Sequence, residues 1–264
     1  MNYEWRGAPL EGMAYGEDSL HVPNGMQTLF PWANSVVDSL SGFERLPYRR
    51  SNVPRDVLTF VKGKSKDGIW ESVPVYTYPG FSYSQVAKFK DIEGNNTLRK
   101  MAKYFNLFLK FEGQKIRKIN HALATRYQSG SDHIGEHHDK VATYKKGAPT
   151  ISVSFGATRP FLLRKGEELI RISLKDGDIF ILGWKDNETY THSVPKMTGE
   201  VGERVSLIFR AIQVEYGVQK KVMAALRGKE WRAKKKQEKA NAESIGNEAG
   251  DDSTGNEAGD VLLE

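Results

Sequence analysis

Apolar and polar positions alternate in short segments through the second half of the chain, and turn residues separate these segments. Alternation with a period of two predicts strands, because it places one apolar face against a core. Turns such as SGSD, KDGD and GWKDN lie between them. Many short strands at a spacing of about ten residues favour an all-β sandwich or jelly roll over an alternating α/β sheet. The strands expected here are Ala122–Tyr127, Thr150–Phe155, Pro160–Arg164, Glu168–Leu174, Asp178–Leu182 and Arg204–Ile212.

The first half of the chain shows fewer regular segments. Glycine and proline interrupt any periodicity up to residue 50, so residues 1–50 are expected to form an irregular N-terminal extension. Two strands are expected, at Asn52–Val61 and Trp70–Tyr78. In Asn96–Phe111, apolar residues recur at helical spacing and predict a helix.

Composition narrows the classes of protein and of site. The chain has 264 residues, of which 39% are hydrophobic, so it is long enough for one domain with appendages. It contains no cysteine, which excludes disulfides, thiolate metal sites and a cysteine nucleophile. No apolar run approaches the roughly 18–20 residues of a membrane span, and the N-terminus lacks the pattern of a secretory signal. We therefore expect a soluble, intracellular monomer without a membrane partner.

The net charge of +6 is unevenly distributed. Residues 218–240 hold nine Lys/Arg and two Glu, a net of +7, and residues 241–264 hold seven Asp/Glu and no Lys or Arg, a net of −7. The remaining +6 belongs to residues 1–217. We expect residues 217–264 to form a basic helix followed by a disordered acidic tail. The basic segment is either a solubilising tail or a surface for nucleic acid or nuclear import. The second interpretation favours a location in the nucleus over the cytoplasm.

A candidate metal site lies in DHIGEHHDK, the segment Asp132–Lys140. In an extended chain residues i and i+2 point to the same side, so His137 and Asp139 can face one point. His192 lies about four strands later, far enough for the chain to return to the same place. Two imidazoles and one carboxylate form the facial triad of non-haem Fe(II) oxygenases, although zinc also accepts these ligands.

The last expected strand separates apolar from basic residues. Val205, Leu207 and Phe209 share one face, which we expect to pack into the core. The opposite face carries Arg204, Ser206, Ile208 and Arg210. If this face points inward, its two arginines need an anionic partner, because an unpaired buried guanidinium is costly. A small dicarboxylate would supply one; the alternative is a strand whose basic face is exposed to solvent.

Together these features resemble the AlkB family of Fe(II)/2-oxoglutarate dioxygenases, in particular its eukaryotic nucleic-acid repair branch. The resemblance runs from about Trp70 to Gln213 and is strongest in RYQSGSDHIGEHHDK, PTISVSFGATRPFLLR, HSVP, RVSLIFR and YTYPG. It implies a mainly β fold with flanking helices, built on a double-stranded β-helix of the jelly-roll or cupin type. The dioxygenase domain is expected at 51–216.

The resemblance also implies roles for particular residues. The metal ligands, which carry the catalysis, would be His137, Asp139 and His192. The residues expected at the 2-oxoglutarate site are Tyr127, Arg204, Arg210, Ser206 and Thr125. The residues expected to contact a flipped base are Tyr76, Tyr78 and His137. The implied reaction consumes molecular oxygen, demethylates N-alkylated bases in DNA or RNA, and releases succinate, CO2 and formaldehyde.

Several positions depart from the family pattern. Thr125, Ser206 and Ile208 replace residues that commonly contact 2-oxoglutarate, and Val141 stands where a carboxylate often approaches the base. These departures leave two alternatives open. The same oxygenase chemistry could act on a protein side chain or a small molecule, or the chain could be a non-catalytic module that binds nucleic acid.

Overall fold

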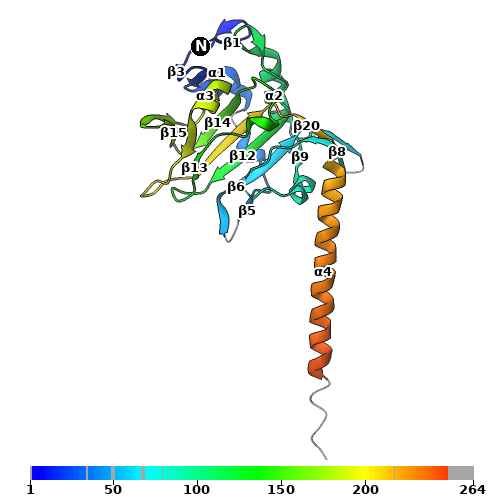
Figure 1. Ribbon diagram of the computed structural model, residues 1–264. Coiled ribbons are helices and arrows are strands. Elements are labelled where there is room, and N and C mark those ends of the chain that lie inside the picture. The colour runs from blue at the N-terminus through cyan, green and yellow to red at the C-terminus, as the bar shows by residue number, and fades with distance from the viewer. Residues whose placement is uncertain are drawn as a thin grey trace, which may run out of the picture.

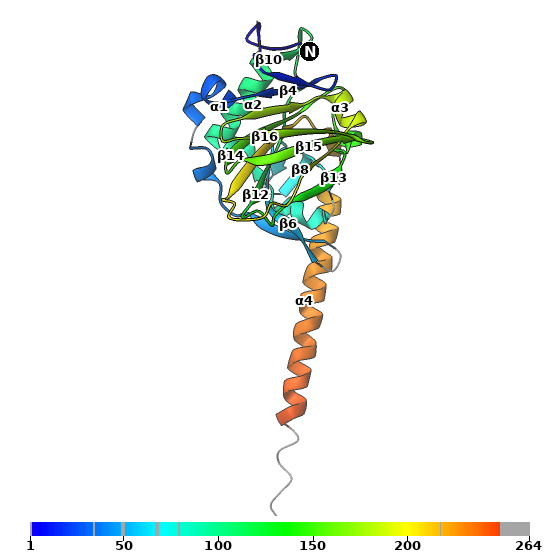
Figure 2. The same cartoon turned by 90° about the vertical axis from the view of Figure 1, so that its left-hand side faces the viewer.

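Two β-sheets face each other and enclose the centre of the protein (Figures 1 and 2). The computed structural model describes residues 2–33, 35–48, 51–66, 69–78, 80–216 and 218–248. In Figure 2 the strands β15 (Arg159–Lys165) and β16 (Glu168–Leu174) lie in front of the larger sheet. This arrangement is the jelly-roll core that the strand pattern predicted.

The larger sheet has nine strands. Along the sheet their order is β3 (Met13–Tyr15), β4 (Ser19–Val22), β17 (Ile179–Leu182), β14 (Thr150–Gly156), β19 (Arg204–Arg210), β12 (His121–Tyr127), β6 (Ser51–Val61) and β5 (Glu44–Tyr48), with β9 (Lys90–Asp91) parallel to β6. The smaller facing sheet has the order β13 (Ile134–His137), β18 (Thr191–Val194), β15 and β16.

Two small sheets and four α-helices complete the described part of the chain. The sheets are β11 (Gln114–Lys115), β10 (Leu109–Phe111), β1 (Tyr3–Trp5) and β2 (Ala8–Pro9), and β20 (Val214–Tyr216), β8 (Ile69–Pro74) and β7 (Lys64–Lys66). The helices are α1 (Gly25–Leu29), α2 (Asn96–Phe108), α3 (Trp184–Thr189) and α4 (Val218–Glu248). Short 3-10 turns lie at Pro31–Ala33, Val37–Ser39, Tyr83–Lys88, Ile92–Gly94 and Val141–Thr143.

Helix α2 covers the outer face of the larger sheet. Its buried residues Leu98, Met101 and Phe105 pack in one core with Leu207 and Phe209 of β19. The Asn95 side chain accepts a hydrogen bond from the Leu98 backbone and caps the helix. The apolar face of β19 is thus occupied by α2, and its other face, with Arg204 and Arg210, turns toward the smaller sheet.

The expected strands and the expected helix agree with the structure to within a few residues. One strand and the helix, however, end earlier than predicted. The strand predicted to reach Tyr78 ends at Pro74, and the chain then turns into the centre of the protein. The helix predicted to reach Phe111 ends at Phe108, because Leu109 pairs with Trp5 of β1. The end of the helix is therefore set by pairing with a distant strand, which the local periodicity of the sequence cannot predict.

Residues 1–50 are not the irregular extension that the sequence predicted. Strand β4 is buried throughout and pairs with β17 in the larger sheet. Leu20 and Val22 join the α2 core, while His21 on the opposite face lies 2.8 Å from the Asp178 carboxylate. Only two of the four residues of β4 are apolar. Such a short pattern does not distinguish a strand from a loop in the sequence.

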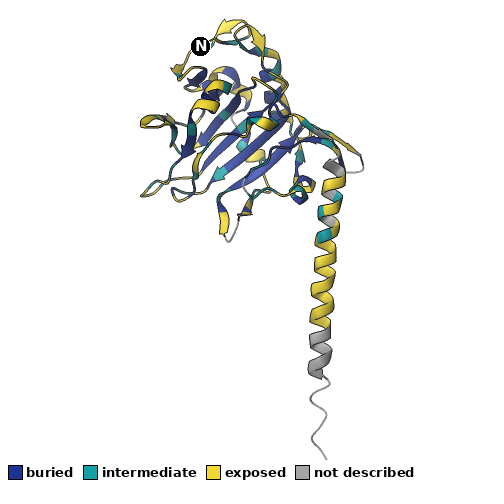
Figure 3. Ribbon diagram, viewed as in Figure 1, coloured by how far each residue is buried: buried dark blue, intermediate teal, exposed yellow. Residues whose placement is uncertain are grey.

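Helix α4 extends away from the body of the protein, and its side chains between residues 227 and 241 are nearly all exposed (Figure 3). Its first turns pack against β8 and against the turn Tyr83–Lys88. The helix continues to Glu248, past the point where the sequence predicted a disordered tail, because Ala and Glu favour helix even where the charge changes sign. The rest of the predicted tail, residues 249–264, lies outside the described residues. Within the described ranges, no helix combines the length and hydropathy needed to cross a membrane.

Candidate metal centre

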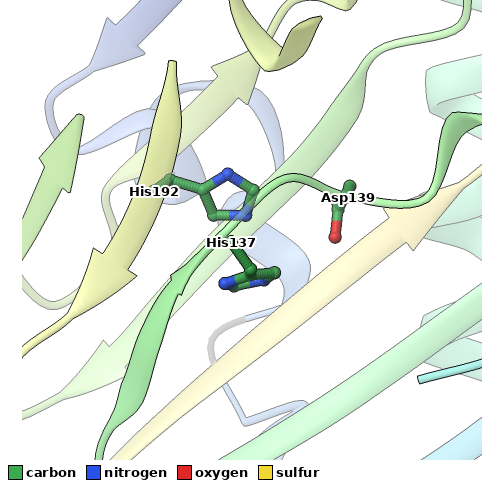
Figure 4. A group of neighbouring side chains, drawn as sticks. All are labelled: His137, Asp139 and His192. Carbon is green, nitrogen blue, oxygen red and sulfur yellow. The ribbon is translucent and has the colours of Figure 1, made fainter. Parts of the chain in front are cut away.

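Two histidines and one aspartate converge between the two sheets (Figure 4). His137 ends β13, Asp139 follows it, and His192 lies on the neighbouring strand β18, where it pairs with His137. One ligand atom from each residue lies within 4.8 Å of the others. His138 points away, and its Nδ1 lies 2.6 Å from the Asn187 carbonyl oxygen. The structure therefore brings together the three residues that the H-x-D pattern and His192 predicted.

The Asp139 carboxylate is held in place by four neighbouring groups. Its Oδ1 accepts a hydrogen bond of 2.9 Å from the Tyr76 hydroxyl. Its Oδ2 accepts bonds of 2.8 Å from Tyr144 and 2.9 Å from Thr150. The Arg210 guanidinium lies 3.3 Å from both oxygens. Burial alone would raise the pKa of Asp139, but these contacts and above all Arg210 hold it well below its ordinary range, so the carboxylate is ionised.

Burial favours the neutral form of both histidines. Burial lowers the pKa of His192 to about 3, and its neighbour His137 acts in the same direction. Burial also lowers the pKa of His137, and Asp139 partly opposes this. The His137 Nδ1 lies 2.8 Å from the Gly135 carbonyl oxygen, which fixes that ring nitrogen as a donor and leaves Nε2 for a metal. Neutral imidazoles beside an ionised carboxylate form the donor set that Fe(II) prefers in a facial triad.

A cavity of about 410 Å³ opens beside the three ligands. Strands β12 and β19 form one of its walls, with Thr125 opposite Ser206 and Tyr127 opposite Arg204. These four residues and Arg210, which are the residues expected at the 2-oxoglutarate site, all line the cavity. The structure thus brings the whole predicted set to one wall.

Arg204 is the residue on this wall whose polar atoms are least satisfied. It is fully buried, and its Nη2 donates a hydrogen bond of 2.9 Å to the Ser154 hydroxyl. Its Nε and Nη1 have no hydrogen-bond partner among the described residues. No carboxylate lies within ion-pair distance of it in the described chain, and its guanidinium lies 5.4 Å from the Tyr127 ring. A buried cation with free donors fits a carboxylate of a dicarboxylic acid.

Arg210 differs from Arg204 because the protein already supplies its counter-charge. Its Nε donates to the Tyr144 hydroxyl at 2.6 Å, and its guanidinium lies 4.3 Å from the Tyr76 ring. Its Nη1 is buried without a partner in the described part of the chain. Burial would lower the pKa of Arg210, but Asp139 raises it above its ordinary value. Arg210 therefore links the metal ligand to the cavity wall and keeps one donor free.

Of the two tyrosines predicted to contact a substrate base, only Tyr78 offers much of its surface. Tyr76 is 5% exposed and uses its hydroxyl on Asp139. Tyr78 is half-buried at the cavity, stacked 6.2 Å from the Tyr76 ring, and burial raises its pKa to about 12. Tyr76 therefore connects the YTYPG segment to the metal site, while Tyr78 presents an aromatic surface.

Sequence reasoning missed Tyr144, Thr150 and Asn187, which all contact Asp139 or its backbone. They reach Asp139 from a turn, a strand and a helix, so no spacing rule connects them to the H-x-D segment. Their hydroxyl and amide groups form the outer layer of contacts that orients a metal ligand.

The profile of the 2OG-Fe(II) oxygenase superfamily matches residues 48–210. The chain belongs to this superfamily. Membership implies Fe(II) and 2-oxoglutarate, which the sequence predicted, and the donor set and the free donors of Arg204 fit both.

The chain is also similar to curated proteins called DNA oxidative demethylase ALKBH2. The protein from Bos taurus is 36% identical over 104 residues, which cover 36% of this chain and 37% of that protein. The Homo sapiens protein is 35% identical over 104 residues and 40% of its length. The match thus spans about two-fifths of these relatives. They confirm the resemblance to the AlkB family. A solved structure titled OsALKBH1 is 18% identical, covers 75% of this chain and all of its own, and has a TM-score of 0.49.

A further histidine, His121, lies buried behind the site. It is fully buried on β12, and neither ring nitrogen has a hydrogen-bond partner in the described structure. Burial lowers its pKa to about 3, and Arg210 adds to this. An unfolded histidine has a pKa of about 6.5.

We expect the metal-free protein to lose stability as pH falls through this window. Between pH 6.5 and 3 the unfolded chain binds more protons at residue 121 than the folded chain, so the free energy of unfolding rises with pH. His121→Leu should reduce this slope by up to about 1.4 kcal/mol per pH unit. Urea unfolding of both proteins at several pH values from 4 to 7 measures it; equal slopes would contradict the prediction.

Proposed function

We propose that this protein is an Fe(II)/2-oxoglutarate-dependent dioxygenase that removes alkyl groups from N-alkylated bases in DNA or RNA. One observation carries the proposal. A single cavity contains the candidate iron ligands, the unpaired buried Arg204 and the aromatic surface of Tyr78. The metal, an anionic co-substrate and a planar substrate would thus meet in one space.

The relatives support the nucleic-acid substrate. The bovine and human proteins are named for oxidative demethylation of DNA. They match 36% of this chain at 35–36% identity. The extension of this activity to the present chain is part of the proposal.

Each group of residues has a distinct task. His137, Asp139 and His192 would hold the metal, and Arg204 with Tyr127 would bind the far carboxylate of 2-oxoglutarate. When bound, iron with 2-oxoglutarate and oxygen supplies the oxidation that converts an N-methyl group to formaldehyde. Tyr78 and the ring of His137 would hold the flipped base by stacking. The apolar side chains of Ile208, Leu123 and Phe161 line the cavity and would limit the entry of water.

Helix α4 would add a contact to nucleic acid outside the cavity. Its exposed residues include Arg232 and Lys234–Lys236, and Trp231 is 64% exposed between them and Arg227. The helix has no continuous apolar face, which separates it from helices that lie on membranes. Its first turns pack on the turn Tyr83–Lys88, which follows the YTYPG segment that carries Tyr76 and Tyr78.

We expect Lys234→Gln, Lys235→Gln and Lys236→Gln together to weaken oligonucleotide binding in low salt. Each lost phosphate contact should reduce the slope of log affinity against log salt by about 0.9 for duplex DNA or about 0.7 for a single strand. Fluorescence anisotropy at several salt concentrations measures the slope. The matched control replaces the exposed Lys100, Lys103 and Lys115 by Gln. Equal losses in the two variants would show a general effect of net charge and contradict the role of α4.

The experiment that tests the proposed function measures both products. The protein is loaded with Fe(II) and 2-oxoglutarate and given methylated and unmethylated oligonucleotides of DNA and RNA, single- and double-stranded. We expect formaldehyde in step with succinate from at least one methylated strand. Succinate without formaldehyde from any strand would overturn the nucleic-acid substrate. No succinate above that of Asp139→Ala would overturn the dioxygenase activity.

A further inference from the structure

The cavity carries no free negative charge on its described walls. Its lining contains two carboxylates, Glu136 and Asp139. Glu136 accepts a hydrogen bond of 2.8 Å from Arg164, and Asp139 is surrounded by four donors. A substrate that enters therefore meets no unpaired carboxylate.

One wall instead presents a guanidinium. Arg55 lies on β6, two residues before Val57, which pairs with Thr125 of the 2-oxoglutarate wall. Side chains two residues apart share a face of a strand, and both Arg55 and Val57 line the cavity. The neighbouring Asp56 points to the other face, where it pairs with Arg45 and Arg126. It is therefore not available to Arg55.

Arg55 is poorly satisfied in the protein itself. Its one hydrogen bond in the described structure runs from Nη1 to the His133 carbonyl oxygen at 3.3 Å. No carboxylate in the described chain forms an ion pair with it. Burial lowers the pKa of Arg55, while the nearby hydroxyls of Tyr127 and Tyr78 oppose this. A guanidinium has five donors and remains charged, so Arg55, which lines the cavity, keeps donors for a bound molecule.

We propose that Arg55 donates hydrogen bonds to an oxygen acceptor on the flipped nucleotide, and that the cavity therefore favours neutral, carbonyl-bearing alkylated bases over cationic ones. The assignment rests on the proposed function and adds the class of base. Methylation at N3 of thymine or uracil leaves a neutral ring with a carbonyl on each side of the methylated nitrogen. Methylation at N3 of cytosine or N1 of adenine gives the ring a positive charge. A guanidinium attracts the first kind of ring and repels the second.

The test compares two single-stranded oligonucleotides of one sequence that carry either 3-methylthymine or 3-methylcytosine. Formaldehyde release gives kcat/KM for the wild type, Arg55→Gln, Arg55→Lys and the control Arg99→Gln on α2. We expect the wild type to prefer 3-methylthymine. Arg55→Gln should lower kcat/KM for 3-methylthymine about 10- to 100-fold, as expected for a lost hydrogen bond from a charged donor, and should not lower it for 3-methylcytosine. Arg55→Lys keeps the charge without the planar fork and should give an intermediate value.

Other outcomes overturn the assignment in separate ways. An equal loss on both oligonucleotides would place the contact at a phosphate group and remove the base preference. A raised KM for 2-oxoglutarate would place Arg55 in the co-substrate site. Unchanged values, or a wild type that prefers 3-methylcytosine, would also contradict it. If the wild type releases succinate but no formaldehyde from either strand, the proposed function fails and this assignment fails with it. Circular dichroism and thermal melting check that each variant is folded.

Discussion

Asp139→Ala should abolish iron binding and 2-oxoglutarate turnover. The substitution removes one of three metal ligands, so the loss should exceed the roughly 10- to 100-fold that removing an outer partner of a ligand costs. It also leaves Arg210 buried without its counter-charge, which should reduce the free energy of unfolding by about 3–5 kcal/mol. Anaerobic titration with Fe(II) in the presence of 2-oxoglutarate measures binding through the charge-transfer absorption, and urea unfolding measures stability.

Asp178→Asn is the matched control for the loss of a buried carboxylate. Asp178 is as buried as Asp139 and is paired with His21, but it lies outside the ligand cluster. The substitution Asp178→Asn should reduce the stability of the protein and leave iron binding intact. If both variants retain the absorption, or both lose it, Asp139 has no special role as a ligand. Asp139→Asn, which keeps the shape of the side chain, separates the lost charge from the cavity that alanine creates.

Arg204→Leu should raise the KM for 2-oxoglutarate by about 100-fold or more while iron binding in the absence of 2-oxoglutarate stays unchanged. The free Nε and Nη1 of Arg204 are suited to a bidentate contact with a carboxylate, and such charge-assisted pairs contribute about 1.5–3 kcal/mol per hydrogen bond. Removing a buried, unpaired guanidinium should leave the stability of the protein without 2-oxoglutarate unchanged or increased. Succinate release at varied 2-oxoglutarate concentrations gives the KM.

Arg159 provides the control for this substitution. Its guanidinium also lies 5.4 Å from the Tyr127 ring, and it is fully buried. It donates, however, to the backbone carbonyls of Ser129, Asp132 and Pro195. Arg159→Leu should therefore destabilise the fold and leave the KM of the remaining folded enzyme close to that of the wild type. A larger KM change for Arg159→Leu than for Arg204→Leu would reverse the two roles.

The sequence predicts those parts of the fold in which local pattern and tertiary packing agree. Strand β19 separates Val205, Leu207 and Phe209 from its two arginines, and the structure places α2 against the first set and the cavity against the second. Two of the metal ligands could likewise be predicted from the sequence, because an extended chain places His137 and Asp139 on one side. The return of His192 to the same place followed from the number of intervening strands.

Other features depend on contacts between residues distant in the chain, which a local pattern does not encode. Strand β4 is recognisable only through its pairing with β17, some 160 residues later. Arg55 looks like an ordinary surface cation in VPRDV, and only the pairing of β6 with β12 shows that it faces the cavity. Tyr76 is similar: its motif predicted a contact with substrate, and its hydroxyl is bonded to the metal ligand Asp139 instead.

The place of β4 has a practical consequence for work with fragments. The region that matches the superfamily begins at residue 48, which suggests a convenient point for trimming the chain. Such a fragment would lose β4 and leave one side of β17 without its partner strand. The exposed edge would run along Ile179, Phe180 and Ile181, an apolar row of unpaired backbone groups that invites strand addition from a second molecule. Strand β4 thus covers an apolar edge of the core, and we expect a fragment without it to self-associate.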